Sequence, residues 1–205
     1  GTLAVTFTAS QGLLLMLPNL YRIAGELLPG VFHIASRTIA THSLSIFGDH
    51  SDIYACRQTG AAILAESSVQ EVMDLSPAAH LCAIEGRVPF LNFFDGFRTS
   101  HELHKIQVWD YETLRDMLDM RYVNDFREKA LHPRHGKMMG SAQNPDIFFQ
   151  ASEAANPFYN ALPEIVEQTF DKINKRLGAS YGLFNYYGHK SPVHAIIAMG
   201  SVCET

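Results

Sequence analysis

Residues 6–37 read TFTASQGLLLMLPNLYRIAGELLPGVFHIASR and carry the pattern of an α/β protein. A short apolar run is followed by a polar turn, a long apolar stretch with helical periodicity, a Pro-Gly break and a second apolar run. Arg37 stands directly after that second run. Because a buried charge is costly unless it is paired, an arginine at the end of a buried strand indicates contact with an anion.

The same alternation of apolar runs and helical patterns extends over the first half of the chain. Short apolar runs predict buried strands over 3–7, 31–36, 53–56 and 88–94. Helical periodicity predicts helices over 11–28, 58–65 and 69–85. Such alternation is typical of a doubly wound, mainly parallel sheet with helices on both of its faces.

The helix expected over 69–85 carries two local signals. Ser67-Ser68 followed by Glu71 predicts a capped start, because a serine hydroxyl and a glutamate three residues later can satisfy free backbone N–H groups. Pro77 lacks an N–H and its ring clashes with the preceding turn, which predicts a kink or a split.

The second half of the chain is more polar. Amphipathic patterns predict surface helices over 111–129 and 163–177, the second ending at Gly178 as a C-cap, with an exposed loop over 132–141. A new apolar run predicts a strand over 193–199. We therefore expect a first domain over residues 1–185 and the beginning of a second α/β domain over 186–205.

Composition excludes several classes of protein. The 205 residues have a formal net charge of −5 and no run of Lys or Arg longer than a pair, so nucleic acid is not expected as a partner. No apolar stretch reaches the roughly 18 residues of a membrane span, and no basic segment precedes an apolar run as in a secretory signal. Three widely spaced cysteines fit a reducing compartment such as the cytoplasm.

Arg37 is the first candidate for a binding role. The carboxyl ends of strands are where open α/β sheets place their ligands, and a guanidinium matches a carboxylate with two parallel hydrogen bonds. The alternative is a structural ion pair with a nearby acidic residue.

The turn around Ser10 and Gln11 is the second candidate. It joins a strand to a helix whose free N–H groups face the same edge of the sheet, which suits an anion or the polar edge of a cofactor. The alternative is a capped helix start. Phosphate-loop and dinucleotide-binding glycine patterns are absent from the sequence.

Residues 95–102 follow the strongest apolar strand and give a third candidate, with Arg98 or His101 contributing to a site. The alternative is a turn at Asp95 with a local ion pair between Arg98 and Glu102. None of the 10 histidines has the spacing of a metal site, no CxxC pair occurs and no G-x-S-x-G nucleophile motif occurs. We expect no metal site in this segment alone.

Several segments resemble one known family. They are TFTASQGLLLMLPNLYRIAGELLPGVFHIASR at 6–37, LSIFGDHSDIYACRQTG at 44–60, SSVQEVMDL at 67–75, VPFLNFFDGFRTSHE at 88–102, AQNPDIFFQ at 142–150, EAANPFY at 153–159 and AMGSVCET at 198–205. Together they resemble the first, pyrimidine-binding domain of the pyruvate:ferredoxin (or flavodoxin) oxidoreductases. The segments cover most of the chain in the order of that family.

The resemblance implies a function. These enzymes decarboxylate pyruvate on thiamine diphosphate and Mg²⁺, pass electrons through [4Fe-4S] clusters to ferredoxin or flavodoxin, and transfer the acetyl group to coenzyme A. By resemblance, Arg37 binds the carboxylate of pyruvate, the full enzyme is a homodimer, and its location is the cytoplasm or, in a eukaryote, an anaerobic energy organelle.

The resemblance also implies missing parts. The family's SEAGA-type glutamate and PITPSS-type threonine would precede this chain, and the cluster cysteines and magnesium segment would follow it. We therefore expect an N-terminally truncated, internal fragment that does not turn over pyruvate by itself. Two alternatives stay open: an oxidoreductase acting on another 2-oxo acid, and a non-catalytic assembly or interaction module.

Overall fold

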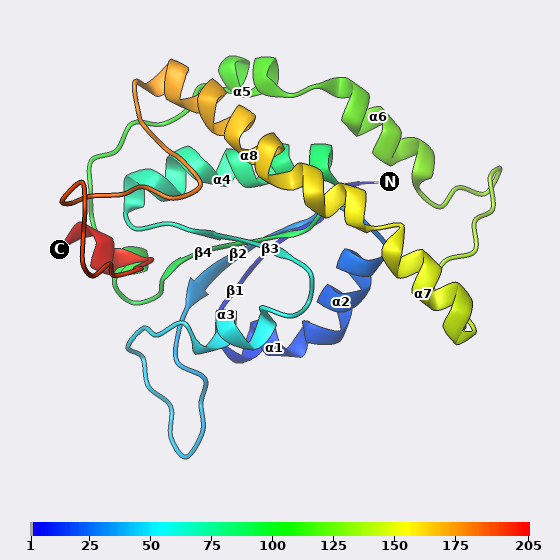
Figure 1. The fold of residues 1–205 in the computed structure, drawn as a ribbon, viewed down its shortest axis with the longest axis horizontal. Helices are drawn as coiled ribbons and strands as arrows, with labels where there is room; N and C mark the ends of the chain where they lie inside the picture. The colour runs from blue at the N-terminus through cyan, green and yellow to red at the C-terminus, as the bar shows by residue number, and fades with distance from the viewer. Residues whose placement is uncertain (1) are drawn as a thin grey trace.

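The computed structural model describes residues 2–205, which fold around a four-stranded parallel sheet (Figure 1). The strands are β1 (Val5–Thr8), β2 (Val31–Ser36), β3 (Ala62–Ala65) and β4 (Phe90–Asp95), in the spatial order β1-β2-β4-β3. All three pairings are parallel, and β2 has the bounds that the sequence predicts. The expectation of a mainly parallel α/β sheet is confirmed.

Helices cover both faces of this sheet. One face carries α1 (Gln11–Leu15), α2 (Leu17–Gly25) and α3 (Ser51–Cys56). The other carries α4 (Val69–Gly86), with α8 (Asn156–Leu177) packed along it. The remaining elements are α5 (Tyr111–Met117), α6 (Met120–Lys129), α7 (Pro145–Glu153) and the short 3-10 helices η1 (Thr99–His101) and η2 (Ser201–Glu204).

Side chains that alternate along β2 and β4 build two separate cores, because successive residues of a strand point to opposite faces. Val31 and Phe90 pack with α4 and α8. Phe32 and Phe93 pack with Leu13 of α1 and other residues on the opposite face. The sheet is therefore held from both sides, and its carboxyl edge carries the loops that end each strand.

Two expected elements are exchanged in type. Residues 53–56, predicted as a strand, belong to helix α3, and residues 62–65, predicted within a helix, form strand β3. A four-residue apolar run does not distinguish a buried strand from a buried helical turn. Gly60 has a φ of +88°, and this turn lets the chain leave α3 and enter the sheet.

Two long predicted helices are interrupted. The helix expected over 11–28 forms α1 and α2, and Pro18, which lacks an N–H, lies in the first turn of the second piece. The helix expected over 111–129 forms α5 and α6. Asp119 separates them, and its carboxylate caps α6 by accepting a hydrogen bond from the N–H of Arg121 at 2.9 Å.

Pro77 does not split α4, which runs unbroken over 18 residues, so that expectation is wrong in its stronger form. The predicted cap is confirmed: Ser68 Oγ accepts from the N–H of Glu71, and Glu71 Oε2 accepts from the N–H of Ser67 at 2.6 Å. Gly178 ends α8 with a φ of +67°, as predicted for a C-cap. The loop over 132–141 is exposed, also as predicted.

The strand expected over 193–199 does not form. Its apolar side chains, including Val193, Ile196 and Ile197, are at least 90% exposed. A strand needs a partner for its backbone groups, and within residues 2–205 this segment pairs with none of the four strands of the sheet. The boundary between residues 1–185 and 186–205 stays a prediction.

Candidate functional site at the carboxyl edge of the sheet

The carboxyl ends of β1, β2 and β4 meet at one edge of the sheet, because the strands are parallel and adjacent. In the register, Thr8 lies beside Ile34, and Ser36 lies beside Asp95. The segments that follow these strands begin at Ala9, Arg37 and Gly96. All three candidates from the sequence, namely the Ser10 turn, Arg37 and the segment 95–102, therefore begin at this edge, where α/β sheets bind ligands.

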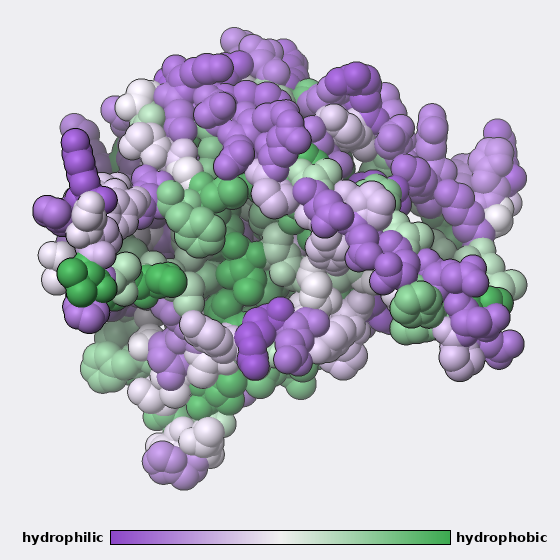
Figure 2. Space-filling view, viewed as in Figure 1, coloured by the Kyte–Doolittle hydropathy of each residue, from purple (hydrophilic) through white to green (hydrophobic). Residues whose placement is uncertain are grey.

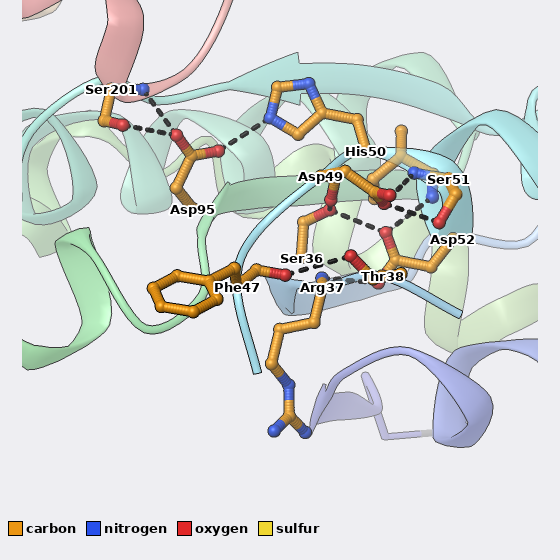
Figure 3. A network of polar contacts seen from close by, with 11 residues as sticks. Ser36, Arg37, Thr38, Phe47, Asp49, His50, Ser51, Asp52, Asp95 and Ser201 are labelled. Atoms are coloured by element: carbon orange, nitrogen blue, oxygen red, sulfur yellow. Dashed lines mark hydrogen bonds and ion pairs between the residues drawn. The ribbon is translucent and has the colours of Figure 1, made fainter. Parts of the chain in front are cut away.

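A buried carboxylate, that of Asp52 in α3, holds this edge together (Figure 3). Its Oδ2 accepts hydrogen bonds from the backbone N–H of Ser10 at 2.9 Å and of Arg37 at 3.2 Å. Its Oδ1 accepts from the hydroxyl of Ser36 at 2.6 Å and from the N–H of Ile53 at 2.8 Å. The side chain is 0% exposed and has no cationic partner within residues 2–205. Asp52 thus joins the ends of two strands through neutral donors.

The Arg37 side chain points away from the Asp52 carboxylate (Figure 3). Within residues 2–205 its guanidinium makes no ion pair within 4.0 Å, so the alternative of a structural ion pair is not formed. Gly96 packs directly against the aliphatic part of the Arg37 side chain. A Cβ at Gly96 would lie 2.6 Å from Arg37 Cγ and 2.7 Å from the carbonyl oxygen of Ser36. The chain leaves this cation half-buried and available to an anion.

Ser10 and Gln11 differ in what they offer to a ligand. Ser10 is buried, and its hydroxyl lies 2.9 Å from the carbonyl oxygen of Thr38 and 2.7 Å from Gln11 Oε1. Its single hydrogen is therefore used within the protein. Gln11 is exposed, and its Nε2 makes no hydrogen bond within residues 2–205. The donor set at this turn fits the polar edge of a cofactor through Gln11 rather than Ser10.

A second polar cluster lies beside the first and includes Asp95, at the end of β4 (Figure 3). His50 Nε2 lies 2.6 Å from Asp95 Oδ1, and Ser201 donates to Asp95 Oδ2 through its N–H at 2.8 Å and through its hydroxyl. Partial burial favours the neutral acid, but the hydrogen bonds from Ser201 and His50 outweigh it and lower the pKa of Asp95. Asp95 thereby ties the last residues of the chain to the sheet edge.

The other candidates of the 95–102 segment are exposed. Arg98 and His101 lie on the surface, and no ion pair forms between Arg98 and Glu102. Glu102 instead approaches His104 at 3.5 Å. Within residues 2–205 no group of three histidine, cysteine or acidic side chains is placed to hold a metal ion, and no helix is long and apolar enough to cross a membrane.

Glu66, the residue after β3, was not singled out by the sequence patterns. It is 0% exposed, and within residues 2–205 its two carboxyl oxygens, like Oδ1 of the neighbouring Asn92, have no partner at hydrogen-bond geometry. Burial raises the pKa of Glu66 well above its ordinary value, and the nearby charge of Glu71 adds to this. A proton on Glu66 supplies the donor that these oxygens lack.

Asn92 also contacts a pair of histidines, His33 on β2 and His80 on α4, which face each other between the sheet and that helix. Its Nδ2 lies 3.0 Å from His33 Nδ1, and His33 Nε2 lies 3.2 Å from His80 Nε2. Burial, together with the neighbouring His80, lowers the pKa of His33 to about 4, and burial lowers the pKa of His80. Both rings are neutral at neutral pH and act as core hydrogen-bonding groups, which join Asn92 of β4, His33 of β2 and His80 of α4.

Comparison with known proteins identifies the family of this chain. The family model described as "Pyruvate flavodoxin/ferredoxin oxidoreductase, thiamine diP-bdg" matches residues 1–171. The matched region contains all four strands and both polar clusters except Ser201. It also contains Ser10, Gln11 and Arg37.

Three relatives show how widely the sequence is shared. The chain is 64% identical over its whole length to a pyruvate-flavodoxin oxidoreductase of Enterobacter agglomerans and 56% identical to a pyruvate:ferredoxin oxidoreductase of Moorella thermoacetica. It is 54% identical over 98% of its length to a pyruvate dehydrogenase [NADP(+)] of Cryptosporidium parvum. It spans only 18%, 17% and 10% of these relatives. The chain belongs to the pyruvate flavodoxin/ferredoxin oxidoreductase family and represents the part of it described as thiamine diphosphate-binding.

Proposed function

We propose that this chain is part of an enzyme that oxidatively decarboxylates pyruvate to acetyl-coenzyme A and CO₂ and reduces ferredoxin or flavodoxin. The observation that carries the proposal is the half-buried guanidinium of Arg37, which lies at the carboxyl edge of the sheet without an acidic partner in residues 2–205. Its proposed role is to bind the carboxylate of pyruvate through two hydrogen bonds.

The proposed cofactor is thiamine diphosphate, contacted in part by Gln11. When bound, this cofactor supplies the carbanion that adds to the 2-oxo carbon and then takes up the charge released with CO₂. The exposed amide of Gln11 is the donor that this turn offers, whereas the Ser10 hydroxyl supports the turn itself. Arg37 is proposed to orient the carboxylate of the substrate at the carboxyl edge of the sheet, beside the cofactor.

Other parts of the reaction are proposed to reside elsewhere in the polypeptide. The chain spans less than a fifth of the relatives it matches, so Mg²⁺, the [4Fe-4S] clusters and the coenzyme A site are assigned to the remainder. We propose that residues 1–205 alone do not turn over pyruvate. The three relatives differ in the electron acceptor that their names give, which supports an acceptor site outside this shared segment.

The proposal extends to assembly and location. Exposed apolar surface appears in the centre of the view in Figure 2, and Leu44, Ile46 and Phe47 are 45–68% exposed on the loop between β2 and α3. Such surface favours contact with further domains or with a second subunit of the proposed homodimer. The free thiols of Cys56, Cys82 and Cys203 support a reducing location such as the cytoplasm.

Substitution of Arg37 in the full-length enzyme tests this function. A lysine cannot form the two-pronged contact. Both Arg37→Lys and Arg37→Ala are therefore expected to weaken the binding of pyruvate and to raise its KM on the order of 10- to 100-fold. Binding of oxalate, a non-reacting dicarboxylate, should weaken in parallel. Equal affinity of wild type and Arg37→Ala for pyruvate and oxalate would refute the assignment of Arg37 to the substrate pocket. Profiling other 2-oxo acids in the same assay distinguishes pyruvate from a different substrate of this class.

A further inference from the structure

The Asp52 carboxylate accepts a hydrogen bond from the backbone of Arg37 and makes no ion pair with its guanidinium. Oδ2 accepts from the Arg37 N–H at 3.2 Å, while the side chain extends away from the carboxylate (Figure 3). An acid that met the guanidinium itself would neutralise it and compete with a substrate carboxylate. An acid bound to the N–H fixes the residue and leaves the charge for a ligand.

The same oxygen also holds the turn that follows β1. Oδ2 accepts from the N–H of Ser10, 42 residues earlier in the sequence, at 2.9 Å. Ser10 has a φ of +47°, an uncommon conformation for a serine, and Gln11 follows it directly. One buried atom therefore sets the spacing between the turn that carries Gln11 and the residue that carries the guanidinium.

We propose that Asp52 is a positioning residue for substrate recognition, which holds Arg37 and the Ser10 turn in register by accepting their backbone hydrogen bonds. This inference rests on the proposed function of Arg37. It attributes the effect of Asp52 to the position of its oxygens and not to its negative charge. Asp52 itself is 0% exposed and touches no substrate.

Two substitutions separate position from charge. In Asp52→Asn the amide oxygen can take the place of Oδ2 and keep both N–H contacts. Its NH₂ group then faces Ser36 Oγ, whose hydrogen has another acceptor in the carbonyl of Asp49 at 2.9 Å, and the N–H of Ile53, whose lost acceptor should lower stability but not move Arg37. In Asp52→Glu the charge remains, but one added methylene displaces both oxygens in a closed site. Positioning predicts a KM for pyruvate near wild type for Asn and a rise for Glu.

The decisive experiment is a double-substitution cycle in the full-length enzyme, with KM for pyruvate and KM for coenzyme A as readouts. Asp52→Ala and Arg37→Ala are each expected to raise the KM for pyruvate, Asp52→Ala by roughly tenfold from the loss of two hydrogen bonds. In the double variant, Asp52→Ala should add nothing to Arg37→Ala, because it acts through that residue. The KM for coenzyme A should not change.

Asp74 provides a matched control. It is a buried carboxylate on α4 that accepts from Tyr181 Oη and Gln70 Nε2, each at 2.8 Å, on the other face of the sheet. Asp74→Ala should lower thermal stability and leave the KM for pyruvate unchanged. A rise in that KM as large as for Asp52→Ala would show a general loss of structure and overturn the inference.

The outcomes also separate this inference from the proposed function. If Arg37→Ala raises the KM for pyruvate and Asp52→Ala does not, the positioning role of Asp52 is refuted while the proposed role of Arg37 is retained. The same conclusion follows if the two increases in KM multiply in the double variant. If Arg37→Ala leaves pyruvate binding intact, the proposed function fails and the inference with it. Should Asp52→Ala not fold, the Asn and Glu pair decides: a raised KM for Asn with a normal KM for Glu overturns positioning.

Discussion

His50 Nε2 lies 2.6 Å from Oδ1 of Asp95, so the residue that precedes α3 is joined to the last residue of β4. The other carboxylate oxygen of Asp95 receives the N–H of Ser201. Three segments that are far apart in the sequence therefore converge on one side chain. The hydrogen bonds at this side chain are stronger than neutral ones, because the acceptor is charged.

Asp95→Asn should loosen the C-terminal segment. The amide offers one acceptor where the carboxylate offers two, so His50 or Ser201 loses a charged partner, at a cost of about 1.5–3 kcal/mol. Amide hydrogen exchange of the peptide over 196–205 in the full-length enzyme should become faster, and Asp171→Asn, an exposed change on α8, serves as the control. Unchanged exchange in Asp95→Asn would contradict this account.

The pKa of Asp95 gives the pH dependence its sign. Because its hydrogen bonds lower the pKa in the folded protein, its contribution to stability is present above the ordinary value of 3.8. That contribution is lost as the pH falls through the lowered value. Exchange of the same peptide should therefore approach that of Asp95→Asn only in strong acid.

Gly96→Ala should disturb the arginine pocket. The new methyl group would lie 2.6 Å from Arg37 Cγ and 2.7–2.8 Å from the carbonyl oxygens of Ser36 and Ala35. Backbone oxygens cannot swing aside, so we expect a loss of about 1–3 kcal/mol in stability and a raised KM for pyruvate. Gly136→Ala is the matched control, because a Cβ there meets nothing within 4 Å. Normal kinetics for Gly96→Ala would show that Arg37 is not held at this point.

Glu66→Gln should remove a pH dependence from the sheet. Burial raises the pKa of Glu66 in the folded protein, so its contribution to stability is present below the ordinary value of 4.5 and is lost as the pH rises through the raised value. Exchange of peptides over 62–66 and 88–95 should therefore accelerate with pH more in wild type than in Glu66→Gln at each matched pH. Glu167→Gln, an exposed change on α8, should behave as wild type.

Gln11→Ala should selectively weaken the binding of thiamine diphosphate. If the free amide contacts thiamine diphosphate, its loss costs about 0.5–1.5 kcal/mol, or roughly a 2- to 12-fold rise in the cofactor Kd. The control is Gln168→Ala on α8, whose amide, among residues 2–205, donates a hydrogen bond to Glu164 alone, at 3.1 Å. Titration of thiamine diphosphate into the cofactor-depleted full-length enzyme gives the result, and identical Kd values for the three proteins would remove Gln11 from the site.

The sequence predicts the architecture better than the type of each short element. The run over 31–36 is apolar, bounded by Gly30 and Arg37, and forms β2 with those bounds. The run over 53–56 is equally apolar, yet it is helical, and Asp52 in the first turn of this helix points inward and bonds the ends of neighbouring strands. Such a contact depends on residues 15 and 42 positions away, which no local pattern contains.

The same limit applies to the site. Arg37 could be proposed from the sequence because its place at a strand end is visible there, and its role stays a prediction. Asp52, Asp95 and Glu66 were missed as functional groups, since their significance depends on burial and on distant partners. The cluster Asp49-His50-Ser51-Asp52 ahead of an apolar run was the one available signal, because polar residues grouped before buried ones often support a strand edge.

The contact between Asp95 and Ser201 also orders events during synthesis. The ribosome delivers the amino end first, and Ser201 emerges 106 residues after the carboxylate that it binds. Until then, His50 is the one side-chain partner of Asp95 among residues 2–205. A nascent chain from which Ser201 has not yet emerged would lack two of the hydrogen bonds to Asp95, so this carboxylate would stay open to other partners during synthesis.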